Sequence, residues 1–422
     1  MTESAPSRAS RLVVTTREIE PVEDLLAFTD PAQPLAWLRR GDGMVGIGVA
    51  RIIDGGGQGD DERRGSHAAE LADAWRTTVA GASVDDEVAL AGTGLIAFGT
   101  LTFDPASTAA SRLVVPRFVL GRRAGRSWLT TIHSADEVAG DAPRESAWGP
   151  AWSATVGPGE LDAPGYQAAV RAGLDAIAAG EVSKVVLARD LVGSVPVGAD
   201  LRRLVRALAT GYPDVWTYAV DGIIGASPET LVTVSGGAIT ARVLAGTAPR
   251  GADADADTAA SVALSASGKD QDEHRFAVES VLRTLRPHTS ALTASEQPFA
   301  LKLPNVWHLA TDVEGVVGDG ATALDLVGTL HPTAAVAGTP TTAAVGVIRR
   351  LEPFDRGRYA GPVGWIDAAG DGEWAIALRG AQFEPGGRVT AHAGAGIVRG
   401  SDPEAELLET RMKFRPIVDA LA

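Results

Sequence analysis

The chain has 422 residues, with 53 acidic and 38 basic side chains, a formal net charge of −15 and no cysteine. This balance excludes proteins that hold nucleic acid or anionic membranes through a basic surface, and the lack of cysteine excludes disulfides, thiolate metal sites and cysteine nucleophiles. With 45% apolar and 22% charged residues the chain can bury a large core, so we expect a folded protein.

The sequence carries no visible signal for export or membrane insertion. Its amino end is polar and opens no long apolar segment. The longest weakly polar tract, residues 333–348, is interrupted by Pro340 and falls short of the roughly 20 apolar residues that a membrane-spanning helix needs. We therefore expect a soluble cytoplasmic protein without a membrane or nucleic-acid partner, and a monomer is the simplest expectation for its oligomeric state.

Residues 1–150 hold few candidates for chemistry. The apolar pattern predicts strands over 45–53, 93–103 and 112–121. Apolar residues at helical spacing predict a helix over 67–80, and a charged, glycine-rich stretch at 55–65 predicts a loop. We expect this N-terminal α/β portion to contribute to the same sandwich as the rest of the chain.

A more regular pattern follows over the second portion, residues 151–422, after a stretch rich in Trp, Pro and Gly around 143–164. Helices are predicted over 166–179, 199–210, 258–288, 321–330, 340–351 and 404–420. Strands are predicted over 182–192, 215–224, 230–235, 238–244, 306–316, 363–368, 373–384 and 388–398. Helices inserted between runs of strands, without strict alternation, indicate an α+β fold with large antiparallel sheets.

Lysine is rare in this chain, and one lysine lies in an apolar strand. It occurs only at Lys184, Lys269, Lys302 and Lys413, so arginine supplies the other 34 of the 38 basic residues. Because Arg stays protonated, a position that needs a neutral amine cannot accept it. Lys184 begins the segment KVVLAR, where burial would lower the pKa of the ammonium group and make a base available. The alternative is a lysine that reaches solvent at the end of the strand.

Glu229 ends the segment GASPE, which predicts a turn between two strands. A carboxyl group held in such a turn beneath an apolar sheet can have a raised pKa and act as a proton donor. Ser-Pro-Glu is also ordinary turn chemistry, so a purely structural role is the alternative.

Two predicted helices carry glutamates on faces that should pack inward. Glu273 shares a helical stripe with apolar residues, and Glu406, Glu409 and Lys413 follow one another at steps of three and four. Two inward carboxylates suit magnesium, which takes one or two of them and completes its octahedron with water and substrate oxygens. The alternative is an exposed ion pair between Glu409 and Lys413.

Two further patterns complete the candidates from residues alone. The glycines of HAGAGIV, Gly394 among them, can bring backbone N–H groups close to an anion, although a tight bend explains them equally well. His308 lies in the apolar segment WHLAT, where a hydrogen-bonded interior histidine is the default expectation.

In their order along the chain, these segments resemble the chorismate-utilising enzymes, and most closely the isochorismate synthases among them. The matching segments are SKVVLAR, GASPETLV, LAGTAPRG, DEHRFAVE, LPNVWHLATDVEG, LHPTAAVAG, LEPFDRGRYAGPVGWID, GEWAIALRGAQF and HAGAGIVRGSDPEAELLETRMK, over about residues 160–416. The resemblance implies two large antiparallel sheets that pack face to face with helices outside. It does not extend to residues 1–150.

The resemblance also implies roles for individual residues. Lys184 matches the general base for water, Glu229 the general acid and His308 an active-site histidine. The magnesium ligands it implies are Glu273 and Glu409, with Glu406 close by as a water-bridging group. The substrate-binding positions it implies are Gly246, Thr247 and Lys413 near the ring carboxylate and Tyr359, Arg379 and Gly394 near the enolpyruvyl carboxylate.

The implied reaction is the magnesium-dependent isomerisation of chorismate to isochorismate, with water added at C2 and the C4 hydroxyl lost. Members that use ammonia typically have another residue at the position of Lys184, which favours water here. Salicylate synthases share that lysine and add pyruvate elimination, but tend to have Thr at the position of Ala335. A salicylate synthase and a non-catalytic ligand-binding homologue are the alternatives. The sequence leaves open whether the product enters menaquinone or siderophore biosynthesis.

Overall fold

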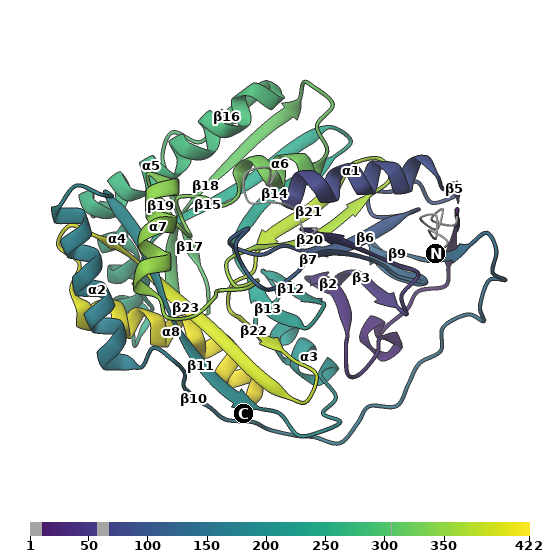
Figure 1. Ribbon diagram of the computed structural model, residues 1–422, viewed down its shortest axis with the longest axis horizontal. Helices are drawn as coiled ribbons and strands as arrows, with labels where there is room; N and C mark the ends of the chain where they lie inside the picture. Colours follow the sequence, from purple (N-terminus) through teal and green to yellow (C-terminus); the bar gives the residue numbers. More distant parts are fainter. Residues whose placement is uncertain (1–10, 57–66, 305) are drawn as a thin grey trace, which may run out of the picture.

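The computed structural model describes residues 11–56, 67–304 and 306–422. Two large sheets pack face to face, with helices on their outer surfaces (Figure 1). The predicted α+β fold with antiparallel sheets is confirmed. The polar amino end and the loop expected at 55–65 lie largely outside the described residues. No helix within the described ranges is long and apolar enough to cross a membrane.

The larger sheet has 13 strands among the described residues. Their order across the sheet is β10 (Val156–Pro158), β11 (Lys184–Ser194), β23 (Arg388–Val398), β22 (Gly380–Phe383), β13 (Ile223–Ser227), β12 (Trp216–Val220), β2 (Leu35–Arg39), β3 (Asp42–Ile47), β8 (Phe118–Arg123), β9 (Arg126–Ser134), β1 (Leu12–Ile19) and β5 (Ser83–Asp86), with β19 (Gly338–Thr339) beside β11. Neighbouring strands are antiparallel throughout, apart from the parallel pair of β1 and β5.

The smaller sheet has 10 strands in the part of the chain that the structure describes, and its pairs are antiparallel. Their order is β16 (Thr289–Ala294), β18 (Val306–Val317), β15 (Ala238–Pro249), β14 (Thr230–Ser235), β21 (Gly372–Ile376), β20 (Pro362–Asp367), β6 (Ile96–Thr100), β7 (Ser111–Val115) and β4 (Arg51–Gly55), with β17 (Phe299–Lys302) beside β18. Strands from residues 1–150 therefore lie in both sheets, and the division at residue 150 stays a prediction.

The helices divide between the two outer surfaces (Figure 1). Those that pack on the smaller sheet are α1 (His67–Ala80), α4 (Ala254–Ala266), α5 (Gly268–Leu285) and α6 (Ala323–Leu330). Those that pack on the larger sheet are α2 (Ala163–Ala178), α3 (Arg202–Gly211), α7 (Thr341–Leu351) and α8 (Pro403–Leu421). Short 3-10 helices are η1 (Leu25–Phe28) and η3 (Arg286–His288).

Side chains from both sheets meet in the larger of two apolar clusters. Trp37 of the larger sheet and Trp365 and Trp374 of the smaller one are fully buried in the same apolar cluster. The indole N–H groups of Trp37 and Trp365 both donate to the Glu373 carboxylate, at 2.9 and 3.1 Å. This shared acceptor satisfies two buried donors and fixes the sheets relative to each other.

The prediction of a single strand is wrong for three segments, because the chain crosses from one sheet to the other within each of them. The stretch 45–53 contains β3 and β4, 112–121 contains β7 and β8, and 373–384 contains β21 and β22, each pair divided between the sheets. The breaks coincide with a positive φ at Gly48, with Pro116 and with a positive φ at Arg379. Apolar periodicity continues through such a break, since the residues on both sides of it are buried.

Other boundaries also differ from the predictions. The predicted strand 215–224 is the hairpin of β12 and β13, turned at Asp221 and Gly222 with positive φ at both. The predicted helix 258–288 is divided into α4 and α5 at Ser267, whose side chain caps α5 by accepting the N–H of Asp270. In the N-terminal portion β1, β2, β5 and β9 were not predicted.

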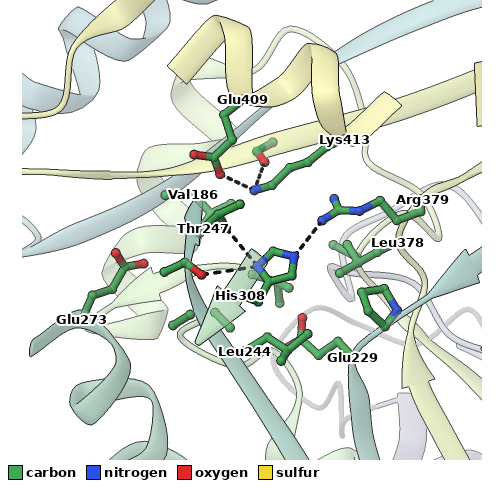
Figure 2. A pocket seen from close by; sticks show the side chains of 18 of the residues that line it. Val186, Glu229, Leu244, Thr247, Glu273, His308, Leu378, Arg379, Glu409 and Lys413 are labelled. Atoms are coloured by element: carbon green, nitrogen blue, oxygen red, sulfur yellow. Dashed lines mark hydrogen bonds and ion pairs between the residues drawn. The ribbon is translucent and has the colours of Figure 1, made fainter. Parts of the chain in front are cut away.

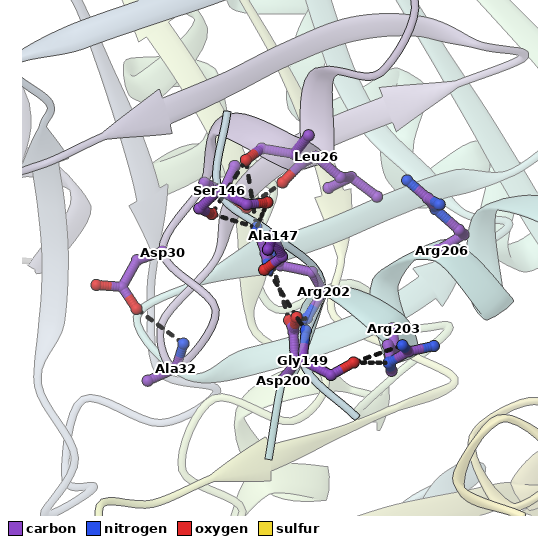
Figure 3. A network of polar contacts seen from close by, with 12 residues as sticks. Leu26, Asp30, Ala32, Ser146, Ala147, Gly149, Asp200, Arg202, Arg203 and Arg206 are labelled. Carbon is purple, nitrogen blue, oxygen red and sulfur yellow. Dashed lines mark hydrogen bonds and ion pairs between the residues drawn. The ribbon is translucent and has the colours of Figure 1, made fainter. Parts of the chain in front are cut away.

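A long segment without regular secondary structure, residues 138–155, runs along the outside of the molecule to the start of β10 (Figure 1). Arg202, at the start of α3, anchors it (Figure 3). The Arg202 guanidinium binds both oxygens of Asp200, at 2.8 and 2.7 Å, and donates to the Ser146 hydroxyl at 2.6 Å and the Ala147 carbonyl at 2.8 Å. We call Arg202, Asp200, Ser146, Ala147 and Gly149 the Arg202 cluster.

Candidate active site

One buried pocket lies where the two sheets separate (Figure 2). The predicted site residues that line it are Lys184, Glu229, Gly246, Thr247, Glu273, His308, Tyr359, Arg379, Gly394, Glu409 and Lys413. Glu406 is buried but does not belong to this lining. The residues come from both sheets and from α5 and α8, which are far apart in the sequence.

Lys184 is the first residue of β11, a strand buried on both faces over its first half. Its side chain does not reach solvent, because the residue is only 8% exposed and Nζ lies 2.6 Å from Oε1 of Glu273. The alternative of a solvent-reaching lysine is therefore wrong. At this distance Glu273 is an ion-pair partner of Lys184, so a base role for Lys184 requires that Glu273 also be engaged by another cation.

Glu229 lies in the two-residue crossover from β13 in the larger sheet to β14 in the smaller one. The Ser227 hydroxyl donates to the Ile376 carbonyl at 2.6 Å, and Ile376 N–H donates to the Glu229 carbonyl at 3.1 Å, so the crossover is fixed against β21. Burial raises the pKa of Glu229 to about 7, although Lys184, Arg379 and Lys413 act to lower it. The carboxyl group can therefore carry a proton near neutral pH.

His308, on β18, lies at the centre of the pocket (Figure 2). Its Nδ1 is 3.0 Å from the Thr247 hydroxyl and 3.3 Å from the Gly246 carbonyl, and Nε2 is 3.4 Å from Nη2 of Arg379. Burial, together with Arg379 and Lys413, lowers the pKa of His308 to about 3. The ring is therefore neutral, with Nδ1–H donating to the Gly246 side and Nε2 accepting from Arg379.

Two residues of α8 form the opposite wall of the pocket (Figure 2). Lys413 Nζ lies 2.6 Å from Glu409 Oε1 and donates to the Gly394 carbonyl at 2.9 Å. Their side chains are 14% and 23% exposed, so the alternative of an exposed surface pair is wrong. Glu406, one turn earlier, is also buried but does not line the pocket.

The three residues expected to bind the second carboxylate, Tyr359, Arg379 and Gly394, all line the pocket. The Arg379 side chain reaches into the pocket from the crossover between β21 and β22. Burial raises the pKa of Tyr359 to about 12, although Arg356, Arg379 and the Gly394 backbone act to lower it. Packing also favours glycine at position 394, since a Cβ there would lie 2.7 Å from the Leu187 carbonyl oxygen of β11.

The carboxylates of the pocket fit a magnesium ion in their chemistry. Glu273 and Glu409 reach the pocket from α5 and α8, and each is paired with a lysine at 2.6 Å. Within the described residues there is no cluster of three or more His, Cys, Asp or Glu that could hold a metal. Two carboxylates are nevertheless a sufficient protein contribution for magnesium, which keeps several water or substrate oxygens.

One residue that shapes the site, His274, was not predicted. His274, next to Glu273, is buried and its ring nitrogens lie 3.2 Å from the Ala245 carbonyl and 2.7 Å from the Thr311 hydroxyl. It thereby joins α5 to β15 and β18. The only signal for His274 in the sequence was its position next to Glu273 in the segment DEHRFAVE. A helical pattern does not reveal on which strands the helix packs.

Comparisons with known proteins show the family to which the chain belongs. A family model described as chorismate binding enzyme matches residues 2–422. A putative isochorismate synthase MenF of Mycobacterium tuberculosis (strain ATCC 25618 / H37Rv) is 38% identical over 345 residues, which are 78% of this chain and 87% of that protein. Isochorismate synthase DhbC of Bacillus subtilis (strain 168) is 40% identical over 268 residues, which are 61% of this chain and 67% of that protein.

Solved structures give the same fold. A putative 2,3-dihydroxybenzoate-specific isochorismate synthase DhbC from Bacillus anthracis matches with a TM-score of 0.77 and 29% identity, over 94% of this chain and 98% of that one. Anthranilate synthase component I from Streptococcus pneumoniae TIGR4 matches with a TM-score of 0.68 and 21% identity, over 99% and 94%. The latter likeness concerns the fold alone.

Proposed function

The chain belongs to the chorismate-binding enzyme family, and we propose that it is a magnesium-dependent isochorismate synthase, which converts chorismate to isochorismate. The observation that carries the proposal is that an amine, Lys184, and a protonatable carboxyl group, Glu229, line the same buried pocket. The names of the relatives support the same reaction.

The pocket suits a substrate with two carboxylates. Burying such a dianion without partners would carry a heavy desolvation penalty, so cations or N–H donors are needed at two places. Arg379 can bind one carboxylate through its fork of donors, with Tyr359 beside it. The Gly246–Thr247 segment lies across the His308 ring from Arg379, and Lys413 lies beside Glu409.

Lys184 and Glu229 supply the proton transfers. Neutral Lys184 takes a proton from a water molecule as its oxygen bonds to C2 of the ring, and protonated Glu229 gives a proton to the hydroxyl group that leaves C4 as water. The ring double bonds shift as the C4–O bond breaks, so one water enters, one leaves and the product is an isomer of the substrate. The pKa of Glu229, about 7, allows this acid to be protonated at neutral pH.

Glu273 on α5 and Glu409 on α8 would hold the magnesium ion, and Glu406, one turn before Glu409, would act through a bridging water. When bound, the ion would supply positive charge that anchors and polarises a substrate carboxylate. With the ion bound, the Glu273 carboxylate would no longer be held by Lys184 alone. His308 is neutral and orients Thr247 and Arg379 through its two nitrogens.

The test is the product formed by purified protein from chorismate, with and without magnesium. We expect isochorismate on chromatography, no pyruvate and no dependence on ammonia. Release of salicylate and pyruvate would instead identify a salicylate synthase, and binding without turnover a non-catalytic homologue. Lys184→Ala should lower kcat by about 10²–10⁴-fold.

Lys302→Ala is the matched control, because Lys302 is an exposed lysine 3.6 Å from Asp257 and does not line the pocket. Its activity should equal that of the parent. An active Lys184→Ala variant would contradict the proposed base.

A further inference from the structure

The backbone at Arg379 has an unusual conformation. Arg379 has a φ of 55°, in the left-handed region that L-residues other than Gly seldom adopt. It ends the crossover of residues 377–379 between β21 of the smaller sheet and β22 of the larger one. Such a conformation persists only where the surrounding structure holds it, and it is most often found at functional sites.

Hydrogen bonds hold the crossover at each residue. Ala377 is fixed by two backbone bonds, from its N–H to the Gly361 carbonyl at 2.8 Å and from the Ala360 N–H to its carbonyl at 3.0 Å. The Arg379 carbonyl accepts the Ala226 N–H at 3.3 Å. Between them the Leu378 carbonyl accepts the Tyr218 hydroxyl at 2.9 Å.

The Leu378 carbonyl has a particular influence on Arg379. It belongs to the same planar peptide unit as the Arg379 nitrogen, and φ of Arg379 is the rotation about the bond that follows this unit. A donor that fixes the carbonyl therefore fixes the plane from which the left-handed turn starts. The Leu378 and Arg379 side chains both lie against the pocket (Figure 2).

The fold makes room for this one hydroxyl. Tyr218 is fully buried on β12. In the sheet, β13 lies between β12 and β22. A Cβ at Gly225 would lie 2.3 Å from the Tyr218 hydroxyl oxygen, and a Cβ at Gly380 would lie 2.8 Å from it. Gly225 and Gly380 face each other in the sheet, so together they leave a path for the phenol across two strands.

We propose that Tyr218 is a positioning residue for Arg379: its hydroxyl holds the Leu378 carbonyl, and thereby places the guanidinium where it meets an anionic group of the substrate beside His308. Tyr218 itself does not belong to the pocket lining. The identity of the anion, a chorismate carboxylate, rests on the proposed function.

The test is Tyr218→Phe, which removes one oxygen atom and keeps the ring. The net free energy of an ordinary hydrogen bond corresponds to a change of about two- to tenfold in a binding constant. We expect KM for chorismate to rise about fivefold with kcat within about twofold of the parent, because the carboxylate that Arg379 binds takes no part in the bond changes. In an Arg379→Lys background, Tyr218→Phe should change KM no further.

Tyr166→Phe is the matched control. Tyr166 is also fully buried, and its hydroxyl donates to a backbone carbonyl, that of Leu187 at 3.2 Å, outside the crossover. It should lose similar thermal stability and keep the parental KM. An equal rise of KM in Tyr166→Phe, or an additive rise in the Arg379→Lys background, would overturn the inference.

A crystal structure of ligand-free Tyr218→Phe tests the geometry without reference to any substrate. We expect φ of Arg379 to leave the left-handed region, or Nη2 to move away from His308 Nε2. An unchanged Arg379 would overturn the inference even if the parent makes isochorismate. A parent that does not turn over chorismate would refute the proposed function, whereas a displaced Arg379 would still support the role of Tyr218.

Discussion

The pocket and the Arg202 cluster both bury charged side chains, but they compensate the charges differently. Arg202 is fully buried and its guanidinium meets both Asp200 oxygens, a hydroxyl and backbone carbonyls (Figure 3). Asp200 also accepts the N–H of Gly149 at 2.9 Å. Burial alone would raise the pKa of Asp200, but the hydrogen bonds from Arg202 and Gly149 outweigh it, so the pKa is lowered.

In the pocket, the effect of burial on the pKa values outweighs that of the neighbouring charges and hydrogen bonds. Burial raises the pKa of Glu229 to about 7 and lowers that of His308 to about 3, and the nearby opposite charges do not restore the usual value of Glu229. A fully hydrogen-bonded charge cluster keeps its ordinary ionisation and stabilises the fold. A buried group whose charged form is not fully compensated changes its proton affinity, which is what acid and base chemistry at neutral pH requires.

The largest effect expected from this difference is the loss of catalysis on substitution in the pocket. Glu229→Gln keeps size and hydrogen bonding but cannot transfer a proton, so kcat should fall by about 10²–10⁴-fold with little change in thermal stability. Steady-state kinetics and thermal unfolding measure the two quantities. A fully active variant would remove Glu229 from the chemistry.

The same residue predicts a pH dependence. The acid form of Glu229 is present below its folded-state pKa of about 7 and is lost as the pH rises through that value. In the parent, kcat/KM should therefore fall at alkaline pH by up to tenfold per unit, as far as Glu229 alone determines it. The residual activity of Glu229→Gln should lack this fall, and a shared alkaline limb would assign the ionisation to another group.

An effect on stability and not on chemistry is expected from the Arg202 cluster. Arg202→Met leaves the buried Asp200 carboxylate without its partner, which typically costs about 3–5 kcal/mol. Denaturant unfolding should show this loss, while kcat/KM per folded molecule stays at the parental value. Equal losses of stability and of kcat/KM would mean that the cluster supports the site as well as the fold.

Arg206→Met is the control on the same helix. Arg206 stacks on Trp148, 3.7 Å from the ring centroid, and pairs with Asp24, but both charged side chains are about one-third or more exposed. Exposed pairs contribute about 1 kcal/mol or less. The difference between the two variants thus isolates what burial adds.

The two regions also differ in how far the sequence could predict them. Lys184 stood out because arginine has replaced lysine almost everywhere else, and Glu409 because helical spacing placed it with Lys413 on an inward face. The Arg202 cluster gave no signal, since its acceptors come from a segment without regular structure. Tyr218 appeared as an ordinary strand residue, because its role depends on β13 and β22 lying beside it, which is a long-range pairing.

The crossovers were missed for a related reason. Alternation of apolar residues reports burial on either side of a strand, and both sides of a crossover are buried. It does not report the φ of Arg379 or which sheet a strand joins. Helical steps have a similar limit, because Glu406, Glu409 and Lys413 share a broad face, yet only Glu409 and Lys413 reach the pocket.

That last distinction predicts a difference within one helix. Glu409→Gln should weaken magnesium binding at least about 100-fold by calorimetry, because it removes a direct carboxylate ligand, whereas Glu406→Gln should weaken it by about 10-fold or less, because Glu406 does not line the pocket. Both variants remove one negative charge from α8, so their difference reports position and not net charge. Equal losses would mean that Glu406 reaches the ion directly in the bound state, and no loss in either would remove α8 from the proposed metal site.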